Sequence, residues 1–418
     1  MDEVEEAAAG RLALARRLAR APAFSSLALG QFRFLLAGTS ASQLGGWMEE
    51  VARGWLVFQL TDSAFQLGLV AFLRGISTLV FSPAAGVVVD RLDRRRIAAF
   101  SQAVPGTVAL LVGLLVSAGW VQMWHLYVMA VVVGASVAVN VPARQVLVYD
   151  VVGSEHLPSA IALNSVTGNV SRIVAPSLGG IIIRVAGTAV AFYGQAAFYG
   201  LAVAATLMLR PLTHVEPVRV PVLAGIREGF DYIRRDERLS RLVIMNVIAN
   251  VLIYPYVTMM PVFAKDLLHG GSAGYGLLLT GVGVGAIPGG LTAASMQGWG
   301  SRGKTMALTA LLYMGMVLAF SFSRLFVLSF AILVVAGIGW SLFVTLNQTL
   351  LQLNLDDAFQ GRGMALYSMA GGLTPFGNLG MGAAAQQFGV PHSVAGFAAT
   401  GLMLAALAGI ASRKIRRL

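Results

Sequence analysis

Three ionisable side chains, Glu49, Glu50 and Arg53, lie in the middle of an apolar segment that runs from Phe32 to Leu60. At the centre of a membrane-spanning helix each such charge costs about 2.5–3.5 kcal/mol. At about 100° per residue all three fall on one side of a helix, so they face protein or water and not lipid. The spacings of three and four residues allow either carboxylate to pair with the guanidinium. Two roles stay open: an ion pair that only fixes packing, or a functional charged site.

Two more arginines are expected inside apolar segments. Arg74 and Glu50 each lie about ten residues, or about 15 Å of helix, from the outer ends of neighbouring segments, so they are predicted to pair. Arg172 lies near the middle of a third segment, on a side with small and polar residues such as Asn169. Two carboxylates against three arginines leave a surplus of one positive charge. This surplus fits an anionic or phenolic substrate, or a carboxylate that stays ionised until a proton arrives.

The elements that position these charges are predicted to be membrane helices. The chain has 418 residues, of which 57% are hydrophobic and only 12% are charged, and it has 48 glycines. Soluble proteins carry about 25% charged residues, so this composition indicates a helical protein that crosses a membrane several times. The chain has no cysteine, and its five histidines are scattered near loops. We therefore expect no metal site and no cofactor.

Twelve apolar segments are predicted to span the membrane. They cover about residues 34–60, 64–89, 97–119, 122–143, 160–184, 189–209, 242–263, 275–295, 305–322, 326–350, 363–387 and 393–411. With the N-terminus in the cytoplasm, 24 of the 30 lysines and arginines fall in the two tails and the even-numbered loops. This is the positive-inside pattern, so both termini are expected in the cytoplasm. Topology thus explains the net charge of +11, and no nucleic-acid partner is expected.

The chain divides into two similar halves near its midpoint. The tetrapeptide ALNS at 162–165 returns as ALYS at 365–368, and Gln145 returns as Gln348, both 203 residues later. Six spans lie on each side of the central polar segment, which predicts two parallel six-helix repeats. The predicted domains are an amphipathic cytoplasmic segment (1–31), a six-helix bundle (32–209), a cytoplasmic linker with an amphipathic helix (210–241), a second six-helix bundle (242–411) and a basic cytoplasmic tail (412–418).

Between the second and third spans the sequence reads GVVVDRLDRRR. A glycine, an Asp-Arg pair four and five residues later and then a basic pair resemble the signature loop of the major facilitator superfamily. The matching residues are Gly86, Asp90, Arg91, Arg94 and Arg95. Asp93 stands where the family usually has a second glycine. The resemblance implies an all-α fold with 12 transmembrane helices in two pseudo-symmetric six-helix bundles.

The same resemblance implies that this loop is part of a cytoplasmic gate between the halves. We expect Asp90 at the positive N-terminal end of span 11, with Arg91 or Arg94 near Asp356 or Asp357. Such contacts would form in one conformer and break in the other.

The fifth span contains a second motif, SRIVAPSLGG, at Ser171–Gly180. It is similar to the Gly-Pro-x-x-Gly-Gly element of the drug:proton antiporters of the family, which implies a gating role for Pro176, Gly179 and Gly180. Ala175 replaces the first glycine. Small residues that only let two helices pack closely are the alternative.

The second half has no charge deep in any span and offers amides and aromatic rings instead. An amphipathic cavity wall and ordinary hydrogen bonding between helices explain them equally well. Together with Arg172, the candidate substrate-binding residues are Asn140, Asn169, Asn246, Asn250, Tyr254, Trp340, Asn347 and Gln348.

More narrowly, Leu44–Leu60, Pro142–Gln145 and Arg172–Gly180 resemble the bacterial branch that holds the enterobactin exporter and macrolide efflux proteins. The resemblance implies proton-driven export of a small amphipathic or anionic molecule by alternating access, in a monomer of the bacterial inner or plasma membrane. Glu50 with Glu49 would carry the proton. A proton-independent facilitator of a lipid or metabolite is the alternative. We expect no enzyme, because adjacent carboxylates on a helix point about 100° apart.

Overall fold

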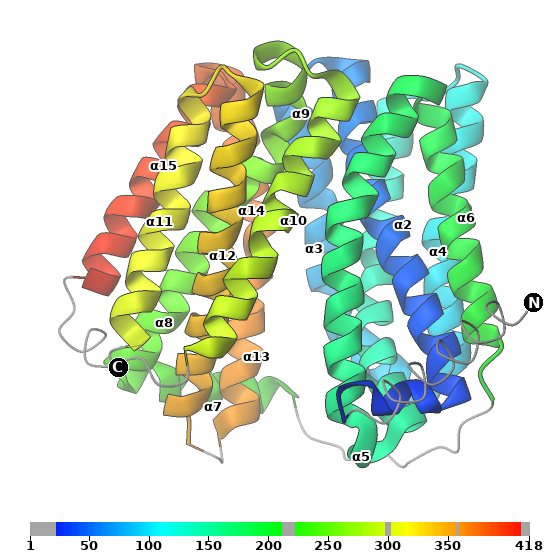
Figure 1. The fold of residues 1–418 in the computed structure, drawn as a ribbon, viewed down its shortest axis with the longest axis vertical. Helices are drawn as coiled ribbons and strands as arrows, with labels where there is room; N and C mark the ends of the chain where they lie inside the picture. The colour runs from blue at the N-terminus through cyan, green and yellow to red at the C-terminus, as the bar shows by residue number, and fades with distance from the viewer. Residues whose placement is uncertain (1–21, 211–221, 297–301, 357–358, 411–418) are drawn as a thin grey trace, which may run out of the picture.

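The computed structural model describes residues 22–210, 222–296, 302–356 and 359–410, except the side chains of 22–23, 86–88, 90–91, 222–227, 229 and 410. The described residues form helices throughout (Figure 1). The first group consists of η1 (Pro22–Ala28), α2 (Gly30–Thr61), α3 (Ala64–Arg91), α4 (Arg94–Ser117), α5 (Met123–Ala186) and α6 (Thr188–Leu207). The second group consists of α7 (Val222–Arg235), α8 (Glu237–Ile248), η2 (Ala249–Ile253), η3 (Tyr254–Met259), α9 (Met260–Val262), η4 (Phe263–Leu267), α10 (Gly271–Ser295), α11 (Arg302–Phe322), α12 (Phe326–Asn354), α13 (Gln360–Gly371), α14 (Thr374–Phe388), α15 (Val390–Ala405) and η6 (Ala406–Ile410).

All twelve predicted spans are helical, which confirms the fold class. Within the described ranges, nine helices are long and apolar enough to cross a membrane. The other three predicted spans are not among these nine helices, for physical reasons. The charges of α2 lower its hydropathy, α5 joins spans 4 and 5, and span 11 is divided between α13 and α14.

The long element α5 is two legs joined at Gly153, where φ is 66° and ψ is −178°. L-residues with a side chain rarely adopt this conformation, so glycine is required at the turn. The first leg, from Met123 onward, therefore extends well past the predicted end of span 4 at residue 143. The second leg begins near Pro158 and corresponds to span 5.

Span 7 is irregular in a way that the sequence explains. Between α8 and η4 the chain passes through π and 3-10 turns around Pro255 and Pro261. Each proline lacks the N–H that would continue the helical ladder, so the backbone bonds shift register at these positions.

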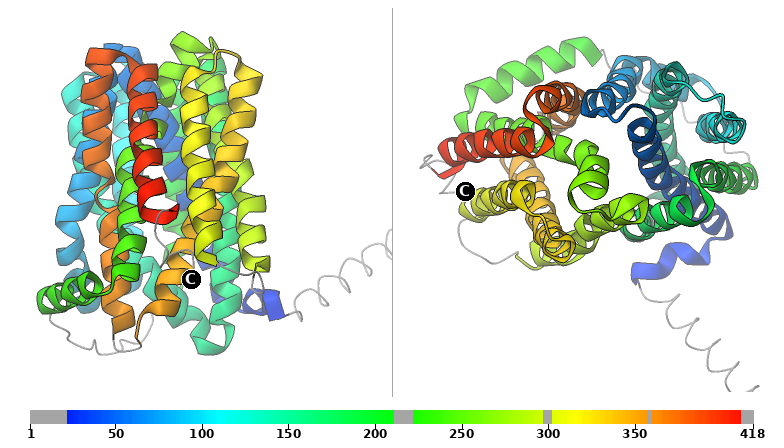
Figure 2. Two further views of the ribbon diagram at one scale, coloured as in Figure 1. Left: turned by 90° about the vertical axis from the view of Figure 1, so that its left-hand side faces the viewer. Right: turned by 90° about the horizontal axis from the view of Figure 1, so that it is seen from above.

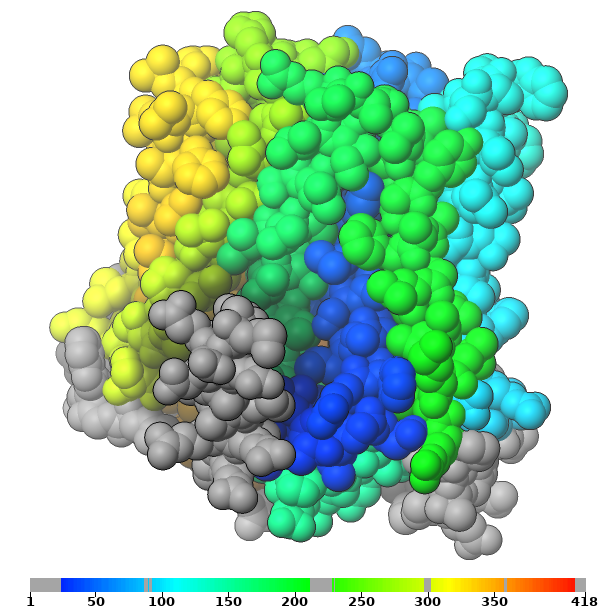
Figure 3. All heavy atoms as spheres, turned by 45° about the vertical axis from the view of Figure 1, so that its right-hand side comes forward, coloured from blue at the N-terminus to red at the C-terminus, as the bar shows by residue number. Residues whose placement is uncertain are grey.

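The two bundles touch mainly at the end where α9 lies, which is the upper end in Figure 1. There the second leg of α5 lies against α10, as Figure 3 shows, and α3 lies against α14. A side chain at Gly276 would overlap the carbonyl of Pro176, and one at Gly180 would overlap the carbonyl of Ser272. Glycine at these positions therefore allows the two backbones to come this close. Lys265 also donates to Asp62 across the bundles at 2.7 Å.

At the opposite end lies α7, which crosses the bundle axis (Figure 2). Its Tyr232 ring stacks on Phe359, with centroids 4.1 Å apart, and Glu228 accepts from Arg362 at 2.8 Å. Both contacts join α7 to the segment that begins span 11. The predicted linker thus contains a helix, whereas residues 1–21 and the tail 412–418 lie outside the described residues.

Candidate transport site

The charges of α2 form a buried ion-pair network. The Glu49 side chain is fully buried, and one of its oxygens accepts from Nε of Arg53 at 3.2 Å. Glu50 accepts from a terminal nitrogen of the same guanidinium at 2.5 Å. Since the spacings are four and three residues, one arginine reaches both carboxylates along the helix.

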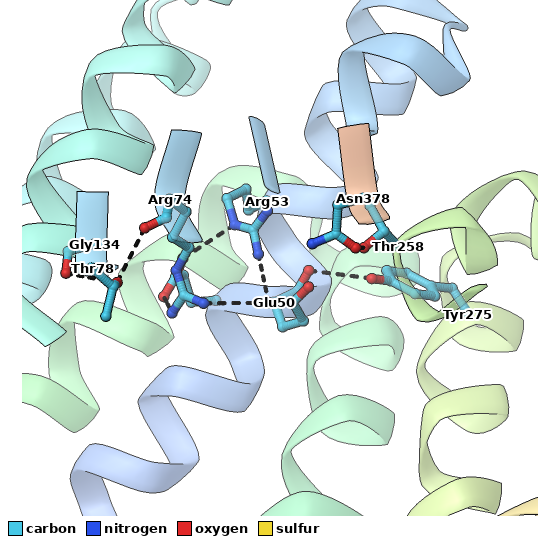
Figure 4. Close-up of polar contacts among 9 residues, drawn as sticks. Glu50, Arg53, Arg74, Thr78, Gly134, Thr258, Tyr275 and Asn378 are labelled. Atoms are coloured by element: carbon cyan, nitrogen blue, oxygen red, sulfur yellow. Dashed lines mark hydrogen bonds and ion pairs between the residues drawn. The ribbon is translucent and has the colours of Figure 1, made fainter. Parts of the chain in front are cut away.

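Arg74 of α3 completes this network. Its guanidinium lies 3.0 Å from the second oxygen of Glu49 and 3.8 Å from Glu50. The structure thus places Arg74 beside both carboxylates, as their equal depth predicts, but closer to Glu49. Figure 4 shows the side chains of Glu50, Arg53 and Arg74 pointing towards one another.

Neighbouring helices hold the network from two sides. Thr78 donates to the carbonyl of Gly134, and the absence of a side chain at Gly134 lets α5 approach the backbone of Arg74. From the other bundle, the Tyr275 hydroxyl donates to the backbone carbonyl of Glu50 at 3.3 Å (Figure 4). The network is therefore in contact with both bundles.

A cavity of about 690 Å³ lies between the bundles and borders the network. Helices α2, α3, η3, α13 and α14 line it. Glu50 and Arg74 face this cavity with 22% and 27% of their side chains exposed, whereas Glu49 is sealed behind them at 0%. Ser82 and Met369 also line it and are exposed, so the cavity opens towards the α7 end.

Aromatic rings surround the other embedded arginine. The Arg172 guanidinium lies 5.4 Å from the centre of the Trp47 ring, and Trp47 lines the central cavity. Tyr254 lines the same cavity, and its ring is 5.7 Å from that of Trp340. A guanidinium over an indole is a favourable cation–π pair. Arg172 therefore lies at the protein interior, close to the wall of the central cavity.

Side-chain hydrogen bonds in the second half connect span 7 to span 11. Asn246 donates to the carbonyl of Tyr367 at 3.1 Å, and Asn250 donates to the side-chain oxygen of Asn246 at 2.8 Å. Thr258 donates to the side-chain oxygen of Asn378 at 3.1 Å, and both of these residues line the central cavity. Thr258 and Asn378 thus reach the cavity, whereas Asn246 and Asn250 bond between helices, and their role in substrate binding stays a prediction.

Two other predicted substrate-binding amides lie between helices of one bundle. Asn140 donates to the Ser101 hydroxyl at 2.9 Å and so joins α5 to α4. Asn347 is fully buried and donates to the Leu242 carbonyl at 3.1 Å. These contacts favour the packing interpretation for both. Gln348 is half-buried on α12, next to Asn347.

The predicted gate divides into three parts. Pro176, Gly179 and Gly180 lie where α5 meets the other helices: Pro176 and Gly180 touch α10, and Gly179 lies under α2. In this conformer Arg94 pairs with Asp150 of its own bundle at 2.8 Å. The contact of Arg91 or Arg94 with Asp356 or Asp357, which is expected in one conformer only, stays a prediction.

Arg95 also bonds within the first bundle, to the Leu207 carbonyl. Gly86 lies within α3, whereas the side chains of Asp90 and Arg91 and the whole of Asp357 lie outside the described residues.

One charged residue of the site was missed from the sequence. The predicted span 4 ends at residue 143, but α5 continues through Arg144, which lines a second cavity together with Asn169. The signal was present: Leu147, Val148 and Val152 continue the apolar pattern, and all three are buried.

The sequence matches the family described as transmembrane secretion effector over residues 21–417, nearly its whole length. The chain belongs to the major facilitator superfamily. It is 25% identical to the staphyloferrin A transporter of Staphylococcus aureus, over 83% of this chain and 87% of the relative. It is 26% identical to the enterobactin exporter EntS of Shigella flexneri, over 82% and 79%. Identity to the multidrug efflux pump Tap of Mycolicibacterium fortuitum is 27%, over 69% and 72%.

Solved structures show the same fold. The nucleoside transporter NupG superposes with a TM-score of 0.73 at 13% identity, covering 91% of this chain and 98% of that one. A bacterial homologue of the lysosomal transporter Spinster gives 0.67 at 15%, covering 92% and 98%. The protein is thus a multi-pass membrane transporter, not an enzyme, and is related to siderophore and drug exporters.

Proposed function

We propose that this transporter exports a small amphipathic anion in exchange for protons by alternating access. The observation that carries this proposal is the unequal exposure of the two carboxylates in one network. Glu50 faces the central cavity, while Glu49 is sealed against two guanidiniums. Ionisable groups inside a membrane protein mark proton or substrate pathways by default.

Glu50 is the carboxylate that gains and loses the proton. Water in the cavity reaches it, so a proton can enter and leave from the open side. When Glu50 is protonated, Glu49 still contacts both Arg53 and Arg74. The network therefore keeps its geometry with one negative charge fewer, which a cycling proton site requires.

The network is also in contact with a helix of the other bundle that must move when the transporter opens at the α9 end. Tyr275 of α10 bonds the backbone of Glu50, and a side chain at Gly54, one turn later, would touch the same hydroxyl. Opening the α9 end must separate α10 from α2 at this point. A shift of α2 on protonation of Glu50 thus changes a contact that the rocking movement breaks.

The cavity wall fits an amphipathic anion. Tyr254 and Trp47 supply aromatic faces, and Thr258 and Asn378 supply hydrogen-bonding groups. The embedded charges, now with Arg144, are two carboxylates against four arginines. This surplus favours a negatively charged substrate, which Arg172 would attract from the wall.

The positive-inside pattern supports a cytoplasmic position for both termini and the α7 end. The present conformer is then open to the cytoplasm and closed at the outer, α9 end. In the opposite conformer the loop at 86–96 closes the cytoplasmic side against span 11, while Pro176 and Gly180 slide against Gly276. We propose that the monomer is the functional unit.

The test uses proteoliposomes and follows proton movement directly, so that no labelled substrate is needed. A pH-sensitive dye inside the vesicles reports proton movement when 2,3-dihydroxybenzoate, erythromycin or lysophosphatidylcholine is added, with and without an imposed pH gradient. The proposal expects at least one probe to move protons and to accumulate only with the gradient. If a protonophore leaves the transport of every accepted probe unchanged, the protein is instead a proton-independent facilitator of a lipid or metabolite.

A further inference from the structure

A second cavity, of about 710 Å³, lies between α2 and the two legs of α5. It shares Gln43 with the central cavity, so the two spaces meet at that side chain. Thr39 lines it and lies eleven residues before Glu50 on α2, which is about 16 Å along the helix axis. The second cavity is therefore nearer to the α7 end than the ion-pair network is.

Arg144 is the cation of this cavity. Arg53, Arg74 and Arg94 each contact a carboxylate, but no residue in the described ranges forms an ion pair or a hydrogen bond with Arg144. A guanidinium without a counter-charge, in a cavity lined by neutral polar and apolar side chains, favours the binding of an anion.

Two further polar groups of the cavity lack partners among the described residues. Thr39 is only 2% exposed, and its hydroxyl bonds nothing there. The side-chain oxygen of Asn164 is buried and equally unpartnered. Native proteins rarely keep buried polar atoms unsatisfied without a reason, and Thr39 and Asn164 both line the second cavity together with Arg144.

We propose that the second cavity is an anion site that binds the carboxylate of a hydroxylated carboxylic acid. The planar guanidinium of Arg144 donates two parallel bonds to the carboxylate, and the Thr39 hydroxyl donates a third. The Asn164 amide, whose oxygen and nitrogen can exchange places by a flip, bonds the hydroxyl beside the carboxylate. This inference rests on the proposed transport of an anion and names the group by which the anion is captured.

The distance along α2 sets an order of events. A molecule of the size of 2,3-dihydroxybenzoate cannot touch Thr39 and Glu50 at once, because about 16 Å of helix separates them. The anion site holds the molecule first, on the α7 side, and releases it past Gln43 into the central cavity. Capture is thus separate from the proton-carrying step.

The chain has no cysteine, so a single introduced cysteine reports on this cavity without background. Ser165 lines the cavity and is exposed, which makes Ser165→Cys the reporter. Purified protein is labelled with anionic and cationic methanethiosulfonates of similar size, and the ratio of the two rates measures the local potential. Adding Arg144→Gln is expected to lower the anion-to-cation ratio about tenfold. The matched control, Arg184→Gln, removes an exposed arginine elsewhere on α5 and leaves the ratio unchanged.

Protection from labelling tests the ligand class. We expect 2,3-dihydroxybenzoate to slow labelling of the reporter and its neutral amide, 2,3-dihydroxybenzamide, to have no effect. Arg144→Lys keeps the rate ratio but loses protection, since an ammonium lacks the planar fork. Thr39→Val, which keeps the side-chain volume, weakens protection without changing the ratio.

An unchanged ratio in Arg144→Gln, or protection that survives in it, overturns the site. Equal protection by inorganic phosphate overturns the assignment to carboxylates. No gradient is applied in these measurements, so their failure is distinct from the failure of proton coupling.

Discussion

Replacing Glu50 by glutamine removes one negative charge from the network and keeps the shape of the side chain. Glutamine can still accept from Arg53, whose guanidinium lies 2.5 Å from Glu50 and 3.2 Å from Glu49. What is lost is the charge on one partner of a pair that is 22% exposed on the Glu50 side. Charge-assisted bonds are about twice as strong as neutral ones, so the expected loss of stability is about 1–2 kcal/mol. The protein should therefore fold and insert.

Glu49→Gln is the matched comparison. The side chain has the same size and lies one residue away, but it is fully buried and contacts two guanidiniums. Breaking a buried ion pair by removing one partner costs about 3–5 kcal/mol. Glu49→Gln should consequently be the less stable variant, although Glu50 is the one that carries the proton.

The assay combines thermal unfolding with transport driven by a pH gradient. Both variants are purified and reconstituted, and uptake of an accepted probe is measured with the gradient and by counterflow without it. Glu50→Gln should lose gradient-driven accumulation and retain counterflow, at near wild-type stability. Full gradient-driven accumulation by this variant would refute the assignment of the proton, and a Glu49→Gln protein as stable as Glu50→Gln would refute the network energetics.

Three further outcomes follow from the contacts. Lys265→Gln removes an exposed ion pair across the bundles that is worth about 0.2–1 kcal/mol. The population of the conformer open at the α9 end should therefore rise by a few-fold. Distances between spin labels on the two bundles measure this population. Gly276→Ala should separate α5 from α10 and slow transport, whereas Gly361→Ala, with no atom within 4 Å of the added carbon, should not; equal rates would contradict the role of this contact. Asn347→Leu removes the hydrogen bond that the Asn347 amide donates to the Leu242 carbonyl and should lower stability by about 0.5–1.5 kcal/mol with little change in probe affinity, whereas a selective loss of affinity would restore it as a substrate residue.

The pairing of Arg74 with the carboxylates could be predicted because helix rise is constant. Counting residues from the ends of two neighbouring spans gives the depth of each side chain, and groups of opposite charge at equal depth in a membrane find one another. The rotation of about 100° per residue likewise predicts that Glu49, Glu50 and Arg53 share one side of the helix and face inward. These inferences need only the geometry of single helices.

The position of Arg144 could not be predicted because the predicted span 4 ends too early, at residue 143. Pro142 and Arg144 interrupt the apolar run, and for this reason the span predicted from the sequence ends at residue 143. Prolines are tolerated within membrane helices when neighbours satisfy the freed groups, and α5 continues to its turn at Gly153. The continued helix places Arg144 in a cavity and brings Asp150 within 2.8 Å of Arg94.

The roles of the amides could not be predicted for a different reason. The sequence gives the face of a helix on which Asn140 or Asn347 lies, but not how the helix is rotated against its neighbours. A cavity wall and a contact between helices use the same residue types. Only the packed structure shows that Asn140 bonds Ser101, and that Thr258 and Asn378 reach the cavity.

The most direct test of the proton site is an infrared difference spectrum of the reconstituted protein between acidic and neutral pH. The carbonyl band of a protonated carboxyl group embedded in the protein should appear at acidic pH. The account predicts that this band is absent in Glu50→Gln and persists in Glu49→Gln. A band that persists in Glu50→Gln would show that another group carries the proton and would contradict the account.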